Sequence, residues 1–235
     1  MKSILLILLL TTTSLFAQQQ KQWIQSLENA DEGRYELKLS NLLSKYTHHD
    51  FSTLLMPQSE FLGFIGSDYR RIHINYSKVS KDEDFPNVYH LKGSTTVYNN
   101  TCDFIGSITI EQVREFKHMY YGVDSMYTHL GMKAQGIIIA SYKFNEHPEQ
   151  QHVGVFEGVM TLWWYLDKAG TLHYYNLNQQ ADDYKNNQYI GTWREYGKDA
   201  PKVCNWGEYR IPFSGDLDLG KGEFSANPKY EDKGW

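Results

Sequence analysis

The chain has 235 residues, of which 15% are aromatic, and its formal net charge at pH 7 is −5. Acidic and basic residues are mixed along it without long blocks of one sign. Because contact with phosphate groups needs clustered Lys and Arg, this composition argues against a nucleic-acid-binding protein.

The first 17 residues have the features of a signal peptide. Lys2 gives a basic start, residues 4–10 are apolar, and residues 14–17 (Ser-Leu-Phe-Ala) form a cleavage site before Gln18. The apolar run is too short to span a bilayer, and no later stretch reaches 18 apolar residues. We therefore expect export to the periplasm or the extracellular space, and a mature chain without a transmembrane segment.

Residues 18–58 have apolar positions at helical spacing, which predicts two short helices. Two such helices alone bury too little apolar surface to be stable, so we expect them to pack against the end or open side of the domain that follows. A strand over residues 35–39 is a competing interpretation that the sequence leaves open. The positions concerned are Trp23, Ile24 and Leu27 in the first helix, Leu39, Leu42, Leu43 and Tyr46 in the second, and Tyr35, Leu37 and Leu39 in the strand.

From residue 59 to residue 235 the apolar period changes to two, which is typical of strands. The pattern predicts an all-β domain, an antiparallel meander of hairpins that is rolled or barrel-like. A loop with a helical turn is expected over residues 120–133, and a hairpin turn over residues 167–170. The predicted strands lie near residues 70–78, 88–98, 102–116, 135–144, 152–166, 172–177, 188–196, 208–213, 216–219 and 223–226.

One short sequence motif, here called the phrase, recurs in this domain. It consists of an aromatic residue, any residue, glycine, and then apolar residues at alternate positions. In a strand these positions point to one face, and the glycine leaves room beside the ring for a neighbouring backbone or side chain. We interpret the unit as a β-hairpin that is repeated with varied loops. The close copies are FIGSITI from Phe104, FEGVMTL from Phe156 and FSGDLDL from Phe213, and looser copies begin at Phe64 and Tyr189.

Two families share parts of this pattern. YIGTWREYG at residues 189–197 resembles a MORN-type repeat, in which aromatic-x-Gly-x-aromatic opens a β-hairpin, and GKGEF at residues 220–224 is similar to the return strand of such units. The resemblance implies the hairpin and the role of the aromatic residue, not a ligand. Gly191-Thr192-Trp193 also resembles the Gly-x-Trp motif of calycin barrels, although there the motif opens the first strand.

Cys102 and Cys204 are the two cysteines of the chain. In an exported protein a pair of cysteines predicts one disulfide, and two buried free thiols are the alternative. Neither cysteine has a histidine or a second cysteine at metal-ligand spacing, and none of the common nucleotide or cofactor motifs is present. We therefore predict no metal site and no cofactor.

The candidate ligand-binding residues lie on the strand predicted over residues 152–166. Phe156, Met160, Leu162 and Trp164 fall on its core side, so the odd-numbered residues take the other face. Rings to stack on a ligand and polar tips to orient it are typical of a binding surface. Alternatively, this face lies under the N-terminal helices or forms an oligomer contact. The candidates are Glu157, Trp163 and Tyr165, with His173 and Tyr175 across the turn.

These features favour an exported, non-catalytic binding or interaction protein. Its partner would be a glycan, a small apolar ligand or another exported protein, bound on the aromatic sheet face or inside the barrel. One alternative is a hydrolase of extracellular glycans, with two of the strand carboxylates Glu111, Glu157, Glu195 and Glu208 as acid and base. The other is a structural or assembly component without a small ligand. No catalytic residue is assigned.

Overall fold

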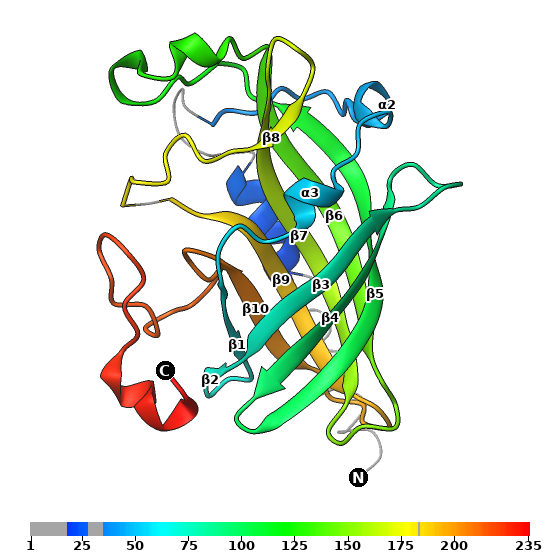
Figure 1. Cartoon of the computed structure of the whole chain (residues 1–235). Helices are drawn as coiled ribbons and strands as arrows, with labels where there is room; N and C mark the ends of the chain where they lie inside the picture. The colour runs from blue at the N-terminus through cyan, green and yellow to red at the C-terminus, as the bar shows by residue number, and fades with distance from the viewer. Residues whose placement is uncertain (1–17, 28–34, 183) are drawn as a thin grey trace.

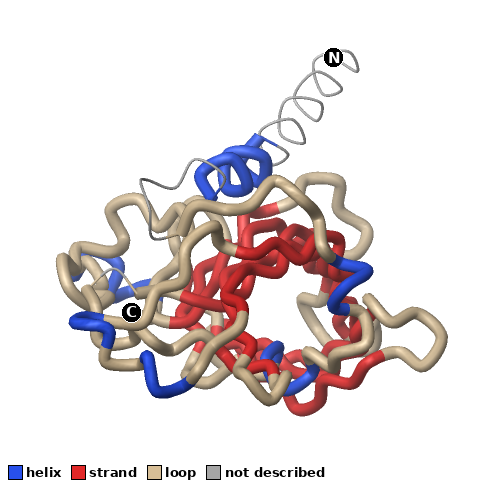
Figure 2. The backbone as a smooth tube through the Cα atoms, turned by 90° about the horizontal axis from the view of Figure 1, so that it is seen from above, coloured by secondary structure: helices blue, strands red, loops and turns tan. Residues whose placement is uncertain are grey.

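The computed structural model describes residues 18–27, 35–182 and 184–235, and the predicted signal peptide lies outside them. The described residues form ten strands of one sheet, which curls into a roll (Figures 1 and 2). This confirms the predicted fold class, a rolled antiparallel all-β meander with short helical pieces near its N-terminus. The boundary between residues 58 and 59 stays a prediction.

The sheet runs in the order β2-β1-β10-β9-β7-β6-β5-β4-β3, and β8 pairs with β7. The two ends of this order meet, because the Ile72 N–H, just before β3, donates to the Gly63 carbonyl of β1 at 3.0 Å. The strands are β1 (Phe61–Ile65), β2 (Arg70–Arg71), β3 (His73–Lys81), β4 (Val88–Val97), β5 (Asn100–Glu115), β6 (Ala134–Glu146), β7 (Gly154–Leu166), β8 (Leu172–Tyr174), β9 (Asn186–Glu195) and β10 (Lys202–Glu208).

The core fills the inside of this roll with aromatic rings, and glycines on its strands, among them those of the repeated phrase, make room for the rings. Gly93 on β4 faces Phe104 on β5, and Gly106 on β5 faces Phe144 on β6. A Cβ atom at either glycine would lie 2.5 Å from the facing ring. The phrase therefore works as predicted on β5, β7 and β9, since its glycine lets a ring or hydroxyl from β6 lie against the backbone.

The N-terminal segment differs from the prediction in its second half. Residues 18–27 are helical, as expected, but the second helix is reduced to the single turn α2 (Leu43–Tyr46), and Leu39 is 90% exposed. Leu37 instead forms a β-bridge with Phe116, as the competing strand interpretation has it. The physical reason is that the end of β5 offers backbone partners: Lys38 N–H donates to the Glu115 carbonyl at 2.8 Å.

A second short helix, α3 (Ser52–Leu55), covers the upper end of the roll in Figure 1. Leu54 and Leu55 are buried in the same core as the interior rings. The 3₁₀ turns η1 (Val123–Ser125) and η2 (Thr128–Leu130) confirm the helical turns expected within the loop of residues 120–133.

The C-terminal segment contradicts the prediction of three further strands. β10 ends at Glu208, and residues 209–235 pair only through the single bridge between Asp218 and Ala226 before η3 (Pro228–Lys233). The third close copy of the phrase is therefore not a strand: Phe213 is 39% exposed with φ +53°. GKGEF also lies in a loop. Period-two spacing misled here because the Arg210 guanidinium, bonded to Asp218 and several loop carbonyls, holds this segment as loops.

The predicted disulfide is not formed, because Cys102 and Cys204 are both buried free thiols. Cys102 lies on β5 opposite Thr95 of β4, whereas Cys204 lies on β10 opposite Gly191 of β9. In the sheet order, β6, β7 and β9 separate the two cysteine strands. The alternative of two buried thiols is the observed one.

Candidate functional site

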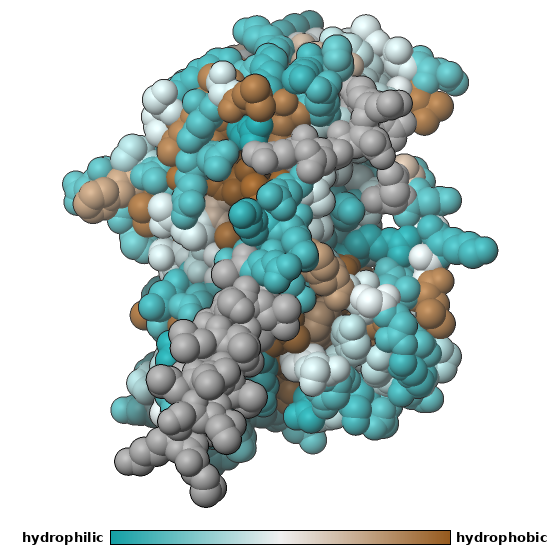
Figure 3. All heavy atoms as spheres, turned by 180° about the vertical axis from the view of Figure 1, so that it is seen from behind, coloured by the Kyte–Doolittle hydropathy of each residue, from teal (hydrophilic) through white to brown (hydrophobic). Residues whose placement is uncertain are grey.

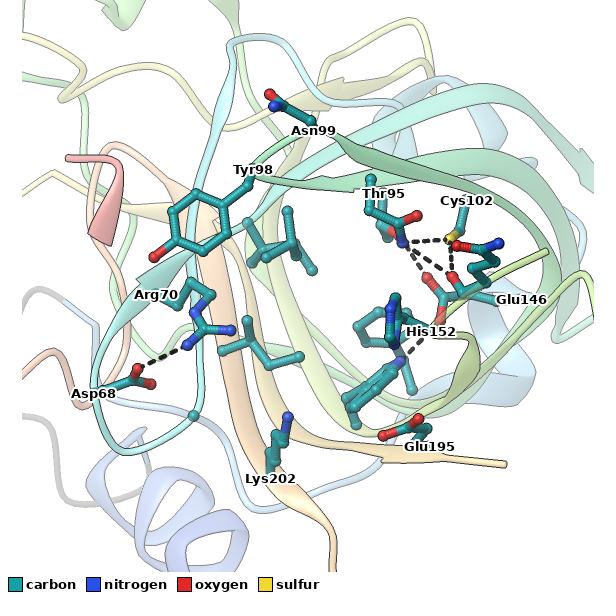
Figure 4. Close-up of a pocket in the computed structure, with 18 of the residues that line it drawn as sticks. Asp68, Arg70, Thr95, Tyr98, Asn99, Cys102, Glu146, His152, Glu195 and Lys202 are labelled. Atoms are coloured by element: carbon teal, nitrogen blue, oxygen red, sulfur yellow. Dashed lines mark hydrogen bonds and ion pairs between the residues drawn. The ribbon is translucent and has the colours of Figure 1, made fainter. Parts of the chain in front are cut away.

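A cavity of about 660 Å³, here called the mouth cavity, opens at the end of the roll away from α3. Its described walls come from the β1–β2 turn, the ends of β4 to β7, and the β9–β10 hairpin. Apolar side chains, among them Ile72 and Phe156, line it beside several ionisable groups (Figure 4). This combination is typical of small-molecule sites.

Glu146 lies at the buried base of the mouth cavity and is 4% exposed. Its carboxyl group accepts three hydrogen bonds. Thr95 Oγ1 donates to Oε1 at 2.5 Å, and both Gly154 N–H and Trp193 Nε1 donate to Oε2 at 2.8 Å. Since each carboxylate oxygen can accept two bonds, Oε1 keeps one acceptor direction among the described contacts.

Burial raises the pKa of the Glu146 carboxyl above its usual range, and the three hydrogen bonds offset only part of this effect. The neutral acid therefore persists to a higher pH than for an exposed glutamate. In that form the carboxyl group can also donate a proton or a hydrogen bond to a molecule in the cavity.

The local sequence explains how Glu146 is held. It is the last residue of β6, and the polar turn after it returns through His152, which has φ +54°, to Gly154. A Cβ atom at Gly154 would lie 2.3 Å from the Arg194 carbonyl, so only glycine lets β7 start this close to β9. Trp193 comes from β9, opposite Phe156.

Cys102 lies beside Glu146 as a thiol with two hydrogen-bond partners. Its Sγ donates to the Gln151 carbonyl at 3.4 Å and accepts from Asn100 Nδ2 at 3.2 Å. Burial raises the pKa of the Cys102 thiol, and the nearby Glu146 adds to this effect. Because the thiolate is the nucleophile, this environment argues against nucleophilic chemistry at Cys102.

The rim of the mouth cavity is charged. The Arg70 guanidinium contacts the Asp68 carboxylate at 3.2 Å and lies over the Tyr98 ring, 5.2 Å from its centroid. Lys202 Nζ, at the start of β10, lies 5.2 Å from the ring centroid of Trp193. Both cations thus lie against rings, which fixes the polar edge above an apolar interior.

The five predicted ligand-binding residues lie elsewhere, and among the described residues none of them lines the mouth cavity. Glu157 is exposed on the outer face of β7. Trp163 packs against Tyr35, with the two ring centroids 4.5 Å apart, and against Tyr175, which is fully buried. This part of the face is covered by the N-terminal segment, as the alternative interpretation had it.

The other two predicted residues, Tyr165 and His173, stack on each other with ring centroids 4.8 Å apart. His173 Nε2 and Asp167 Oδ2 share a hydrogen bond of 2.9 Å across the hairpin turn. This pair lies at the β7–β8 hairpin and is separate from the mouth cavity. A ligand role for any of the five residues stays a prediction.

The four carboxylates of the hydrolase alternative do not converge. Glu111 and Glu157 are exposed, and Glu195 is the one of the four that lines the described mouth cavity. Glu208 is fully buried and does not line the mouth cavity. Its carboxyl group accepts hydrogen bonds from Ser59 N–H at 2.6 Å and from Tyr174 Oη at 2.7 Å. Its role is to join the chain before β1 to β8 and β10.

Sequence reasoning missed Glu146, Thr95 and Gly154. A signal for Glu146 was present, because Tyr142, Phe144 and Glu146 share one strand face, which makes the glutamate inward-facing. The strand predicted from the spacing ends at residue 144, which places this carboxylate in the turn. Thr95 and Gly154 gave no comparable signal, since their role depends on contacts between distant strands.

Comparison with protein-family models, curated proteins and solved structures found no match. The MORN-type and calycin resemblances therefore stay predictions. Within the described ranges, no three His, Cys, Asp or Glu side chains form a group able to hold a metal ion. No helix of the described residues is long and apolar enough to cross a membrane.

Proposed function

We propose that this protein is an exported binding protein that holds one small organic ligand in the mouth cavity. The observation that supports this most is the hydrogen-bonded, buried Glu146 at the base of a cavity of about 660 Å³. This volume lies within the roughly 300–1,000 Å³ typical of ligand pockets. Export rests on the signal peptide that the sequence predicts.

The ligand in this proposal has a polar end and an apolar body. Its polar end carries a hydroxyl, amine or carbonyl group that bonds the Glu146 carboxyl, which accepts at Oε1 or, as the neutral acid, donates. Its body packs against Phe156, Trp193 and the apolar wall around Ile72. Glycans with an apolar substituent and small amphiphilic molecules both fit this description.

A hydrolase is the second candidate, and one observation favours it. The hydrogen bond from Lys198 lowers the pKa of Glu195, whereas burial raises the pKa of Glu146, and both residues line the mouth cavity. Separated carboxyl pKa values are what an acid and base pair needs. Glu195 is already paired with Lys198 at 2.6 Å, which leaves binding as the better-supported function.

The test is isothermal titration of the mature chain with a panel of soluble glycans and small amphiphiles, repeated with Glu146→Gln. The glutamine keeps the donors of Gly154 and Trp193 satisfied through its carbonyl oxygen but removes the acid. We expect a ligand whose Kd rises about tenfold or more in Glu146→Gln, as for a lost bond to an ionisable group.

Glu157→Gln, on the outer face of β7, is the matched control and is expected to leave that Kd unchanged. Equal losses in both variants, or no saturable binding by any compound, would contradict the binding proposal. If no compound binds saturably, a structural or assembly component without a small ligand becomes the better-supported hypothesis. Release of a cleaved product from any glycan that binds would favour the hydrolase.

A further inference from the structure

A second cavity, here called the side cavity, lies on the outer face of the sheet and has a volume of about 260 Å³. The helix of residues 18–27 supplies Trp23 and Leu27, while β6 and β7 supply Ile137 and Trp163. It is separate from the mouth cavity, with which it shares no described lining residue. On this back face apolar atoms gather in one area among polar ones (Figure 3).

We infer that the side cavity is a binding site for a flat, uncharged aromatic molecule of about two fused rings. This site is independent of the proposed function of the mouth cavity. Four observations support it: a rigid base, an arrangement of three rings, a cover from a separate segment, and the volume.

The base of the side cavity is rigid because its residues belong to regular sheet. Ile137 lies directly opposite Trp163 in the β6–β7 register, so their side chains share the outer face. The Asn186 side chain accepts from Trp163 N–H at 2.7 Å and donates to its carbonyl at 3.1 Å, where β8 and β9 diverge from β7. A site on fixed backbone loses little conformational entropy when a ligand binds.

Besides Trp23 of the covering helix, three rings line the side cavity in different orientations. Tyr35 and Trp163 are 4.5 Å apart between ring centroids at an angle of 30°, whereas Phe116 stands edge-on to Trp163 at 85°. Both Tyr35 and Trp163 are only partly buried, and both line the cavity. Faces and edges presented together are what an aromatic guest contacts best, through offset stacking and edge-to-face packing.

The cover of the side cavity is the helix of residues 18–27, which is attached to the sheet by a specific contact. Trp23 Nε1, on the helix of residues 18–27, donates to Thr161 Oγ1 of β7 at 3.3 Å. The Ser26 hydroxyl beside the cavity donates to the Trp23 carbonyl at 2.7 Å, so its proton is already used within the helix. Lys185 also lines the cavity, and its Nζ lies 5.6 Å from the ring centroid of Trp23. The other walls are mainly apolar, in contrast to the mouth cavity with its buried carboxyl group.

The volume of the side cavity determines the size of the ligand that fits it. An apolar protein cavity of about 150 Å³ is known to stay dry and to bind benzene. The side cavity, at about 260 Å³, has room for a second fused ring. A single ring would leave part of the wall without contact atoms, which loses dispersion energy.

The test is calorimetric titration of the mature chain with 2-naphthol, with ¹H–¹⁵N spectra recorded at each step. Saturable one-to-one binding is expected, together with shifts of the indole N–H signals of Trp23 and Trp163, assigned through Phe variants of each. Absence of saturation, or shifts confined to the Trp193 signal of the mouth cavity, would overturn the inference. Tighter binding of 1-octanol than of 2-naphthol would overturn the aromatic class.

Leu27→Trp is the variant that fills the side cavity, and it should weaken 2-naphthol binding about tenfold or more. Gln25→Trp places the same ring at an exposed position of the same helix and is expected to bind as the wild type does. Equal affinity for Leu27→Trp and wild type would refute the site. If Leu27→Trp does not fold, the indole shifts in the wild type decide the question alone.

Discussion

Glu115 attaches the N-terminal segment to the sheet. Its carboxylate, at the end of β5, accepts bonds from Lys38 at 2.7 Å, Lys45 at 2.6 Å and Tyr46 at 2.7 Å. Burial acts to raise the pKa of Glu115, but these hydrogen bonds outweigh it and lower the pKa from 4.5 to about 2. The ionised form is therefore the one that the fold stabilises.

We expect Glu115→Gln to lower the free energy of unfolding at pH 7 by about 1–3 kcal/mol. Because the folded pKa lies below the unfolded one, the contribution is complete above pH 4.5 and is lost as the pH falls toward 2. Urea denaturation at pH 7 and pH 3 measures this: the difference between wild type and variant should shrink at pH 3. A difference of the same size at both values would mean that packing, not charge, is responsible.

The control for this comparison is Glu60→Gln. Glu60 also contacts a cation, Arg71, at 3.4 Å, but its side chain is 62% exposed. Exposed ion pairs contribute little, so we expect a change within about 0.5 kcal/mol. The contrast separates a buried anchor from an ordinary surface pair.

At the scale of single elements, the recurring glycine determines how close neighbouring strands place their rings. A Cβ atom at Gly106 would lie 2.3 Å from the Lys143 carbonyl oxygen and 2.5 Å from the Phe144 ring. The first of these atoms is backbone in the middle of a paired strand, which cannot move without disturbing the register. The aromatic-x-glycine phrase is thus a packing device of this rolled sheet.

Gly106→Ala should therefore destabilise the protein by about 1–3 kcal/mol or more, the usual cost of overpacking. Thermal unfolding followed by circular dichroism measures the effect. Ser107→Ala, at the next position on the same strand, serves as the control and should change the midpoint little. If Gly106→Ala leaves the unfolding midpoint unchanged, β5 and β6 can move apart more easily than the close contacts in the structure indicate.

At the scale of the whole molecule, strand order decides which residues meet. It brings the ends of β4, β6, β7 and β9 to one mouth, where Thr95 and Trp193 both donate hydrogen bonds to Glu146. The same order separates the two cysteines. A curled sheet thus joins polar residues that are distant in sequence, while it places the two cysteines as separate thiols.

We expect thiol titration of the denatured, unreduced protein to find two free thiols per chain, and a reducing agent to leave the melting temperature unchanged. A bond closing a loop of this length would add up to about 4–5 kcal/mol on the chain-entropy model, so its reduction would be easy to detect. Fewer than two thiols together with a lower midpoint after reduction would contradict the structure. The Cys102→Ser variant is the control, because it measures the effect on stability of losing the thiol itself, separately from the effect of reducing a disulfide.

The sequence by itself determined the fold class and the alternation along the main strands, because period-two spacing is a local property of the chain. It placed Ile72, Ile74 and Tyr76 on one buried face, and likewise the core side of β7. It also singled out Trp163, whose ring lines the side cavity, and offered a cover by the N-terminal helices as one alternative for this face.

Only the tertiary structure decided which strands pair, and with them the mouth cavity. Glu146 becomes a site because Thr95, Gly154 and Trp193 converge on it from three other strands, and no local pattern encodes such a meeting. The C-terminal segment shows the same limit, since its alternating residues form loops that are held by the contacts of Arg210 and not by pairing with the sheet. Spacing fixes which way a side chain points, whereas pairing between distant segments fixes what it meets.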